Sequence, residues 1–193
     1  MSIVDKLNFN GQMPNYHNIT KADMLNGDGL RTVLWLSGCS HKCKGCQNPI
    51  TWNPDDGLPI TEQVLEEFIQ ALEQPWCTGV TFSGGDPLYC NNREFVGLLA
   101  KYIKENYPEK DIWLYTGYTL RKQPTGCFFY TKNEEFEWPY LKYIDILVDG
   151  PFDCDVRKND IDNETTVKWR GSSNQRVIVV KDTLKEDYVV CRD

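Results

Sequence analysis

Short apolar runs alternate with longer amphipathic segments along this chain, and that alternation constrains the fold more than any other feature. Each run has the length of a strand, and helical periodicity appears between the first three runs. The predicted strands are residues 32–36, 79–83, 112–116, 144–148 and 176–180. Strands that alternate with helices favour an α/β fold with a largely parallel sheet and outer helices.

Two of the segments between these runs are predicted to be helices. Apolar residues recur at helical spacing over residues 61–73, behind Thr61, which is a good N-cap, and Pro75 ends that helix. A second helix is marked by the apolar residues of 95–103 and ends before Pro108.

Three stretches give no clear pattern. They are the polar lead 1–15, the tail 181–193 and the internal stretch 117–143, where Pro124 and Gly126 interrupt any period. A chain of 193 residues fits one domain with a real core, so residues 1–193 are predicted to form a single domain.

Charge and hydropathy exclude some partners. The chain has 28 acidic and 21 basic residues, a net charge of -7, and no basic stripe that could follow a phosphate backbone. Its first residues do not resemble a signal segment, and no apolar run approaches the roughly 20 residues of a membrane span. We therefore expect a protein of the reducing cytoplasm with neither nucleic-acid nor membrane partners.

Three cysteines follow the first predicted strand at C-x3-C-x2-C spacing. Cys39, Cys43 and Cys46 fall in one short segment, the cysteine loop (residues 37–48). Three thiolates in one loop can each hold one iron of a [4Fe-4S] cluster, which leaves the fourth iron without a protein ligand. That open iron can bind a reacting molecule.

A structural zinc ion is the main alternative for these cysteines. Zinc needs four Cys or His ligands, and the fourth would have to be His41 or a distant cysteine. Paired Cys-x2-Cys knuckles are absent. The other cysteines have no second ligand spacing, and we expect them to be thiols rather than ligands of an auxiliary cluster: Cys77, Cys90, Cys127, Cys154 and Cys191.

Distinctive loops follow four of the predicted strands. They are the cysteine loop, the Gly-Gly loop (residues 83–88, Ser-Gly-Gly-Asp-Pro-Leu), Thr116-Gly117-Tyr118 and Asp149-Gly150-Pro151. Ligands collect at the carboxyl ends of parallel strands, so these loops are expected to converge. Gly84 and Gly85 would let the backbone approach an amino acid's ammonium or carboxylate group, although Gly-Gly-Asp-Pro alone is also a turn signal.

These motifs resemble those of the radical S-adenosylmethionine enzymes. The cysteine loop and the Gly-Gly loop, one strand apart, carry that resemblance. Further motifs resemble one branch, the activating proteins of anaerobic ribonucleoside-triphosphate reductases, and the similarity covers residues from about 16 to about 180. The motifs are Asn26-Gly27-Asp28-Gly29, residues 110–118, Leu147-Val148-Asp149-Gly150 and, most specific, Trp169-Arg170-Gly171-Ser172-Ser173-Asn174-Gln175.

The resemblance implies a fold and a reaction. The fold would be an incomplete (βα) barrel, and S-adenosylmethionine would chelate the open iron of a cluster held by Cys39, Cys43 and Cys46. One electron would cleave S-adenosylmethionine to methionine and a 5′-deoxyadenosyl radical, which would take a hydrogen atom from a glycine of the reductase. The partners implied are the reductase, which would store the glycyl radical, and a reduced flavodoxin- or ferredoxin-like electron donor.

The resemblance also assigns cofactor contacts. Gly84, Gly85 and Asp86 match the loop that contacts the methionine amino group. The segment that matches the adenosyl contacts comprises Gly45, Cys46 and Gln47. The family usually has an aromatic residue at the position of Gln47, and either Trp52 or Tyr118 could replace it or belong to the core.

Three further residues have two interpretations each. For His41, inside the cysteine loop, a solvent-facing side chain is favoured over one that tunes the cluster. Arg170 either meets a cofactor carboxylate or the reductase, or forms a structural ion pair. Asp149 either orients a cofactor or caps the next turn.

Three other functions remain open. The chain could activate a different glycyl-radical enzyme, such as a formate-lyase, or act as a radical S-adenosylmethionine enzyme on a small molecule. A non-enzymatic zinc module is the third.

Overall fold

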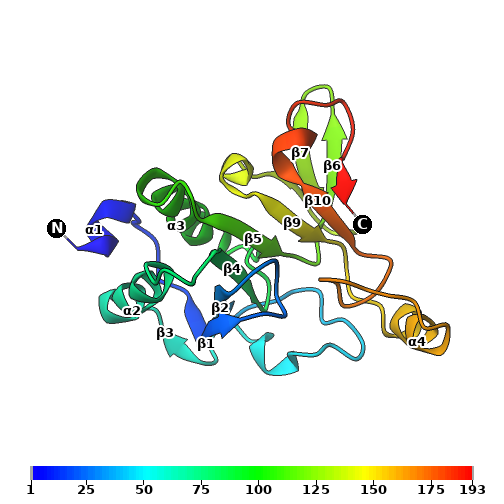
Figure 1. Ribbon diagram of the computed structural model, residues 1–193, viewed down its shortest axis with the longest axis horizontal. Coiled ribbons are helices and arrows are strands. Elements are labelled where there is room, and N and C mark those ends of the chain that lie inside the picture. The colour runs from blue at the N-terminus through cyan, green and yellow to red at the C-terminus, as the bar shows by residue number, and fades with distance from the viewer. Residues whose placement is uncertain (1, 193) are drawn as a thin grey trace.

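The computed structural model describes residues 2–192 and contains a main sheet and a small sheet. The main sheet has the strand order β11-β10-β9-β5-β4-β2-β1-β3 (Figure 1). Its strands are β1 (Asn15–Asp23), β2 (Arg31–Leu36), β3 (Leu58–Pro59), β4 (Gly79–Gly84), β5 (Asp111–Tyr115), β9 (Ile146–Asp149), β10 (Arg176–Val179) and β11 (Cys191–Arg192). The small sheet consists of β6 (Thr119–Gln123), β7 (Gly126–Tyr130) and β8 (Glu135–Glu137).

The helices include both predicted ones. They are α1 (Ile3–Leu7), α2 (Glu62–Leu72), α3 (Arg93–Asn106), α4 (Cys154–Asp162) and α5 (Val180–Thr183), with short 3-10 helices at Pro49–Thr51 and Leu141–Tyr143. Thr61 caps α2 as predicted, because its side chain accepts a hydrogen bond from the Val64 amide. Within residues 2–192, no helix is both long and apolar enough to cross a membrane.

The expected incomplete (βα) barrel with a largely parallel sheet is wrong. The four central strands β2, β4, β5 and β9 are parallel, but the strands on both flanks pair antiparallel. Only three of the seven pairings in the main sheet are parallel. For the part of the chain that the structure describes, the sheet is therefore mixed and open, with β11 and β3 as its edges.

The connection from β5 to β9 explains part of this error. Parallel neighbours are usually joined by a helix, but residues 116–145 form the small sheet and a 3-10 helix instead. This is the stretch in which the sequence showed no helical period. The antiparallel β1 was also missed, because most of its residues are polar and its side chains are exposed or half-buried.

The two faces of the main sheet differ in what covers them. Strand register places Leu34, Phe82 and Leu114 on one face, where they join the main hydrophobic core with Phe68 of α2 and Leu99 of α3. In Figure 1, α1, α2 and α3 lie together at one side of the sheet. This face is dry and well packed.

The opposite face carries a smaller apolar cluster and is covered by loops. Trp113, Val148 and Val177 are buried there, and Trp169 packs on them from a loop. Trp35, Ser83 and Tyr115 continue this face toward the carboxyl ends of their strands. A ligand can therefore approach the sheet on this side without displacing a helix.

The turn Asn26–Gly29 packs against a buried arginine. Arg31 is fully buried and donates hydrogen bonds to Asp28 O at 2.7 Å and Thr81 Oγ1 at 2.9 Å. Gly27 has φ +139, and a Cβ there would lie 2.8 Å from the Arg31 side chain. Glycine at position 27 therefore allows the turn before β2 to pack closely against the Arg31 side chain.

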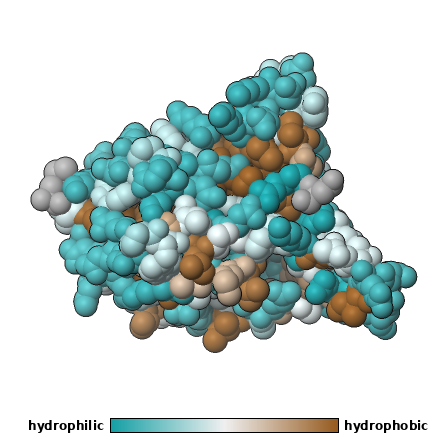
Figure 2. All heavy atoms as spheres, in the orientation of Figure 1, coloured by the Kyte–Doolittle hydropathy of each residue, from teal (hydrophilic) through white to brown (hydrophobic). Residues whose placement is uncertain are grey.

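The exterior is mostly polar. The face shown in Figure 2 is mainly hydrophilic, with apolar side chains in small groups between polar ones. Leu58, on the edge strand β3, is one of the exposed large apolar residues, with 63% of its surface accessible.

Because one face of the sheet carries the core, two leucine substitutions should differ strongly in their effect on the free energy of unfolding. Leu34→Ala should lower the free energy of unfolding by about 2–5 kcal/mol, because Leu34 is 1% exposed and its loss leaves a cavity. Leu58→Ala, the matched control, should cost much less. Urea unfolding followed by circular dichroism measures both, and equal losses would contradict the placement of the core.

Candidate functional site

A cavity of about 420 Å³ opens where the four expected loops converge. Its lining includes residues of the cysteine loop, residues 83–86 of the Gly-Gly loop, residues 115–117 at the end of β5, and Gly150 with Phe152 after β9. The convergence predicted from strand order is therefore confirmed. The four strands β2, β4, β5 and β9 run parallel, which brings the loops that follow them to one edge of the sheet.

All three cysteines of the cysteine loop line this cavity. Burial raises the pKa of Cys39 to about 12, and the negative charge of Asp86 adds to the shift. Burial also raises the pKa of Cys43. Thiols in such surroundings keep their protons until a metal displaces them, so iron binding here must release protons.

No group of three or more His, Cys, Asp or Glu side chains in residues 2–192 is placed to hold one metal ion. A structural zinc ion needs four ligands that converge on one point, whereas a cubane cluster offers a different iron to each thiolate. The Nε2 atom of His41, a candidate for a fourth zinc ligand, lies 2.7 Å from an Asp86 oxygen.

The backbones of the cysteine loop and the Gly-Gly loop run against each other. The Gly85 amide donates to Leu36 O, and the Asp86 amide donates to Gly38 O, both at 2.8 Å. A Cβ on Gly85 would lie only 2.4 Å from Gly38 O. Gly85 is therefore required for the contact between the two loops, and any contact with a cofactor comes in addition.

The carboxylate of Asp86 joins three loops. It accepts hydrogen bonds from the Leu88 amide at 2.8 Å, from Thr116 Oγ1 at 2.9 Å and from the Gly117 amide at 2.9 Å. His41 of the cysteine loop contacts the same carboxylate. Asp86 is only 1% exposed, so these contacts are shielded from water.

The solvent-facing interpretation of His41 is wrong. Its side chain is 9% exposed, and its ring meets the Tyr118 ring edge-on at 4.6 Å. The Tyr118 hydroxyl in turn donates to Glu134 at 2.8 Å. Tyr118 is buried beneath the loop and does not belong to the cavity lining, whereas Trp52 does, so Trp52 is the remaining aromatic candidate near the position of Gln47.

Residues 45–47, which are expected to contact the adenosyl group, lie in two different environments. Gln47 and Cys46 line the cavity. Gly45 packs against α4, and a Cβ there would lie 3.0 Å from Cys154 Cβ. Contacts of Gly45, Cys46 and Gln47 with a cofactor stay predictions.

Asp149 and Arg170 have structural partners. Asp149 is fully buried, forms an ion pair with Arg176 and accepts a hydrogen bond from the Leu120 amide at 2.7 Å. Arg170 Nη1 donates to Gln175 O at 3.1 Å.

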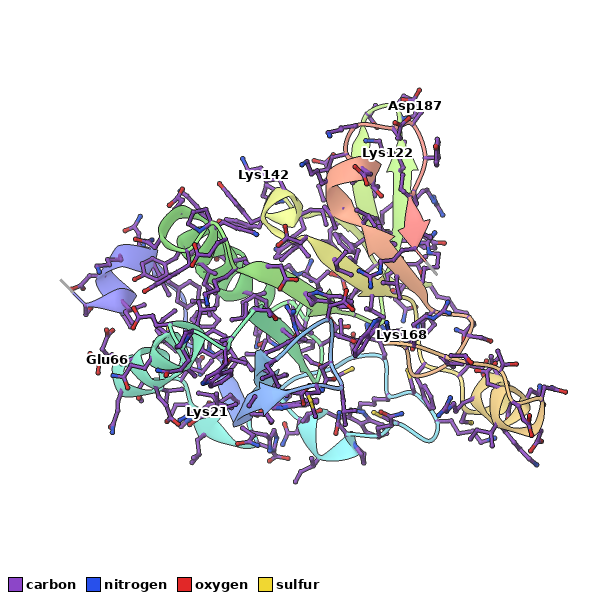
Figure 3. All side chains as sticks on the ribbon, in the orientation of Figure 1. Lys21, Glu66, Lys122, Lys142, Lys168 and Asp187 are labelled. Carbon is purple, nitrogen blue, oxygen red and sulfur yellow. The ribbon has the colours of Figure 1, made fainter. Side chains whose placement is uncertain are left out.

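A fifth segment lines the cavity, and its position was not predicted from the order of the strands. Residues 169–175, the Trp169 loop, contribute Trp169, Arg170 and Gly171 to the lining. Gln175 holds this loop together, because its Oε1 accepts from the Gly171 amide and its Nε2 donates to Gly150 O, each at 2.8 Å. Figure 3 labels the preceding Lys168, between the main sheet and α4. The string was singled out in the sequence, but its position was not predicted.

Comparison with known proteins identifies the family. A family described as a 4Fe-4S single cluster domain matches residues 25–178. An anaerobic ribonucleoside-triphosphate reductase-activating protein from Enterobacteria phage T4 is 40% identical over 163 residues, 84% of this chain and 92% of the relative. Proteins of the same name from Vibrio cholerae and Pasteurella multocida are 37% and 36% identical, each over 83% of this chain and 95% and 94% of the relative, respectively.

The chain belongs to the family of anaerobic ribonucleoside-triphosphate reductase-activating proteins. This confirms the family resemblance drawn from the motifs. The matched 4Fe-4S domain includes the cysteine loop, the Gly-Gly loop and the Trp169 loop.

Asp86→Asn should destabilise the protein. An amide can accept at one oxygen only and would face at least one of the N–H donors with its own N–H group, so a loss of about 1–3 kcal/mol in the free energy of unfolding is expected. Asp55→Asn, at an exposed aspartate, is the control and should have little effect. Chemical denaturation of both variants measures this, and an unchanged midpoint for Asp86→Asn would refute the role of the carboxylate.

Proposed function

We propose that this protein activates an anaerobic ribonucleoside-triphosphate reductase through a [4Fe-4S] cluster and S-adenosylmethionine. The observation that carries the proposal is the shared cavity, in which a three-cysteine loop faces the Gly-Gly loop. Relatives that carry the activating-protein name over most of their length support it.

Cys39, Cys43 and Cys46 would hold three irons of the cluster and leave the fourth open. When bound, the cluster supplies the electron that cleaves S-adenosylmethionine to methionine and a 5′-deoxyadenosyl radical, which then takes hydrogen from a glycine of the reductase. The protein's own contribution is to bind, to orient and to keep water away.

The cofactor-binding residues are assigned by their position in the motifs. Gly84, Gly85 and Asp86 would bind the methionine end. The Asp86 carboxylate would also hold the Gly-Gly loop in place through its hydrogen bonds to Thr116 and Gly117. The residues proposed for the adenosyl part are Gly45, Cys46 and Gln47. Trp35 and Trp52 add apolar walls that shield a reactive intermediate.

The partners follow from the same proposal. The reductase is the protein substrate, and a reduced flavodoxin- or ferredoxin-like protein supplies electrons. We place the activity in a reducing cytoplasm and treat residues 1–193 as one functional domain.

Single cysteine variants test the cluster assignment. Cys39→Ala, Cys43→Ala and Cys46→Ala should each reduce S-adenosylmethionine cleavage to background, because each removes one iron ligand. Cys90→Ala, at an exposed cysteine, should retain it. Anaerobically reconstituted protein is mixed with dithionite and S-adenosylmethionine, and 5′-deoxyadenosine and methionine are measured by chromatography.

Two outcomes would contradict the proposal. Equal loss in Cys90→Ala would mean that the ligands are wrongly assigned. If reconstitution yields no cluster and the protein retains one tightly bound zinc, the protein is a zinc module instead.

A further inference from the structure

Side-chain donors without a partner gather at one cavity. Within residues 2–192, four buried donor atoms that lack a hydrogen-bond partner belong to residues of the cavity lining: Trp52 Nε1, Tyr115 Oη, Trp169 Nε1 and Arg170 Nε. The other buried side-chain atoms without a hydrogen-bond partner are His17 Nε2, Arg93 Nε and the acceptor Asp111 Oδ1, and Arg93 and Asp111 form ion pairs.

This concentration points to a ligand. A buried donor without an acceptor costs free energy, and native proteins contain few of them. Burial raises the pKa of Tyr115, so its hydroxyl keeps its proton and can donate. A ligand that supplies several acceptors would satisfy these groups together.

Tyr115 and Trp169 both pack against the apolar cluster on the open face of the sheet. Tyr115 is the last residue of β5, two positions after Trp113, and the Trp169 ring packs edge-on against Trp113 at 5.8 Å. Trp169 has φ +62, an unfavourable conformation for a non-glycine residue. The neighbouring Gln175 frame holds the loop, so the strain at Trp169 is maintained by its surroundings.

The chemistry of the donors selects one end of the cofactor. An indole N–H and a phenol O–H are neutral donors, which suit neutral acceptors such as purine nitrogens and ribose oxygens. The methionine end is charged and is already assigned to the open iron and the Gly-Gly loop. The nucleoside end is left for the remaining walls.

We propose that Trp169 and Tyr115 bind the nucleoside part of S-adenosylmethionine, with Trp169 Nε1 and Tyr115 Oη donating to its ring nitrogens or ribose oxygens. This inference rests on the proposed function and adds the Trp169 loop to the binding site. Both donor atoms are buried in the ligand-free structure, so the proposal requires their side chains to move when the nucleoside binds.

Phenylalanine substitutions test the role of the donor atoms. Trp169→Phe and Tyr115→Phe keep an aromatic ring and remove the donor. Each should weaken S-adenosylmethionine binding about 5- to 30-fold, the effect of one lost hydrogen bond in a dry site. Isothermal titration calorimetry on the anaerobic, reconstituted and unreduced protein measures binding without cleavage.

Trp138→Phe is the matched control. Trp138 Nε1 already donates to Arg93 O at 2.8 Å, and Trp138 does not line the cavity. Its loss should lower the melting temperature and leave S-adenosylmethionine affinity unchanged. Tyr115→Phe and Trp169→Phe should both lower the S-adenosylmethionine affinity. Tyr115→Phe should do so without lowering the melting temperature, because it removes only an unsatisfied buried hydroxyl.

Two probes locate the contact on the cofactor. Affinity for 5′-deoxyadenosine should fall in both cavity variants, and affinity for methionine should stay at the wild-type value. Iron content per chain, measured in parallel, should equal that of the wild type.

The inference is overturned if both cavity variants bind S-adenosylmethionine as the wild type does, or if methionine affinity falls instead of 5′-deoxyadenosine affinity. Agreement of the Tyr115→Phe result with the prediction supports it even if Trp169→Phe fails to fold. If the wild type carries its cluster but binds no S-adenosylmethionine, the proposed function fails, and this inference with it.

Discussion

The buried carboxylate of Asp86 is the contact on which the site depends. Through it, the Gly-Gly loop is fastened to Thr116 and Gly117 after β5 and to His41 within the cysteine loop. The amides of Gly85 and Asp86 add backbone hydrogen bonds to Leu36 O and Gly38 O. Because the network is dry and nearly every acceptor position is used, it fixes where the cysteines stand relative to the glycines.

The hydrogen-bond network of Asp86 lies at one edge of a sheet whose two faces are covered differently. Helices α2 and α3 seal one face with the main core, so the other face is left to loops and to a cavity at the carboxyl ends of β2, β4 and β5. A closed barrel would bury both faces. Here the small sheet replaces a crossover helix, and the Trp169 loop supplies the wall that strand order did not predict.

The sequence predicted the parts with a strong local signal. The strands at 32–36 and 79–83 and the cap at Thr61 follow from periodicity and capping, and convergence of the loops follows from strand direction. Strand β1 could not be found, because a polar edge strand lacks the apolar pattern. His41 was misread for a related reason, since its burial depends on Tyr118 and Asp86, which are distant in the chain. The incomplete barrel was expected from the resemblance, and the largely parallel sheet with outer helices from the alternation of strands and helices; both were wrong.

The most direct test of the central claim is glycyl radical formation on the reductase. The reconstituted protein, S-adenosylmethionine, a reductant and an anaerobic ribonucleoside-triphosphate reductase are mixed without oxygen, and electron paramagnetic resonance counts radicals per reductase chain. The expected result is a glycyl radical with this reductase and none with a formate-lyase in its place. A cluster that cleaves S-adenosylmethionine yet leaves no radical on the reductase would contradict the claim.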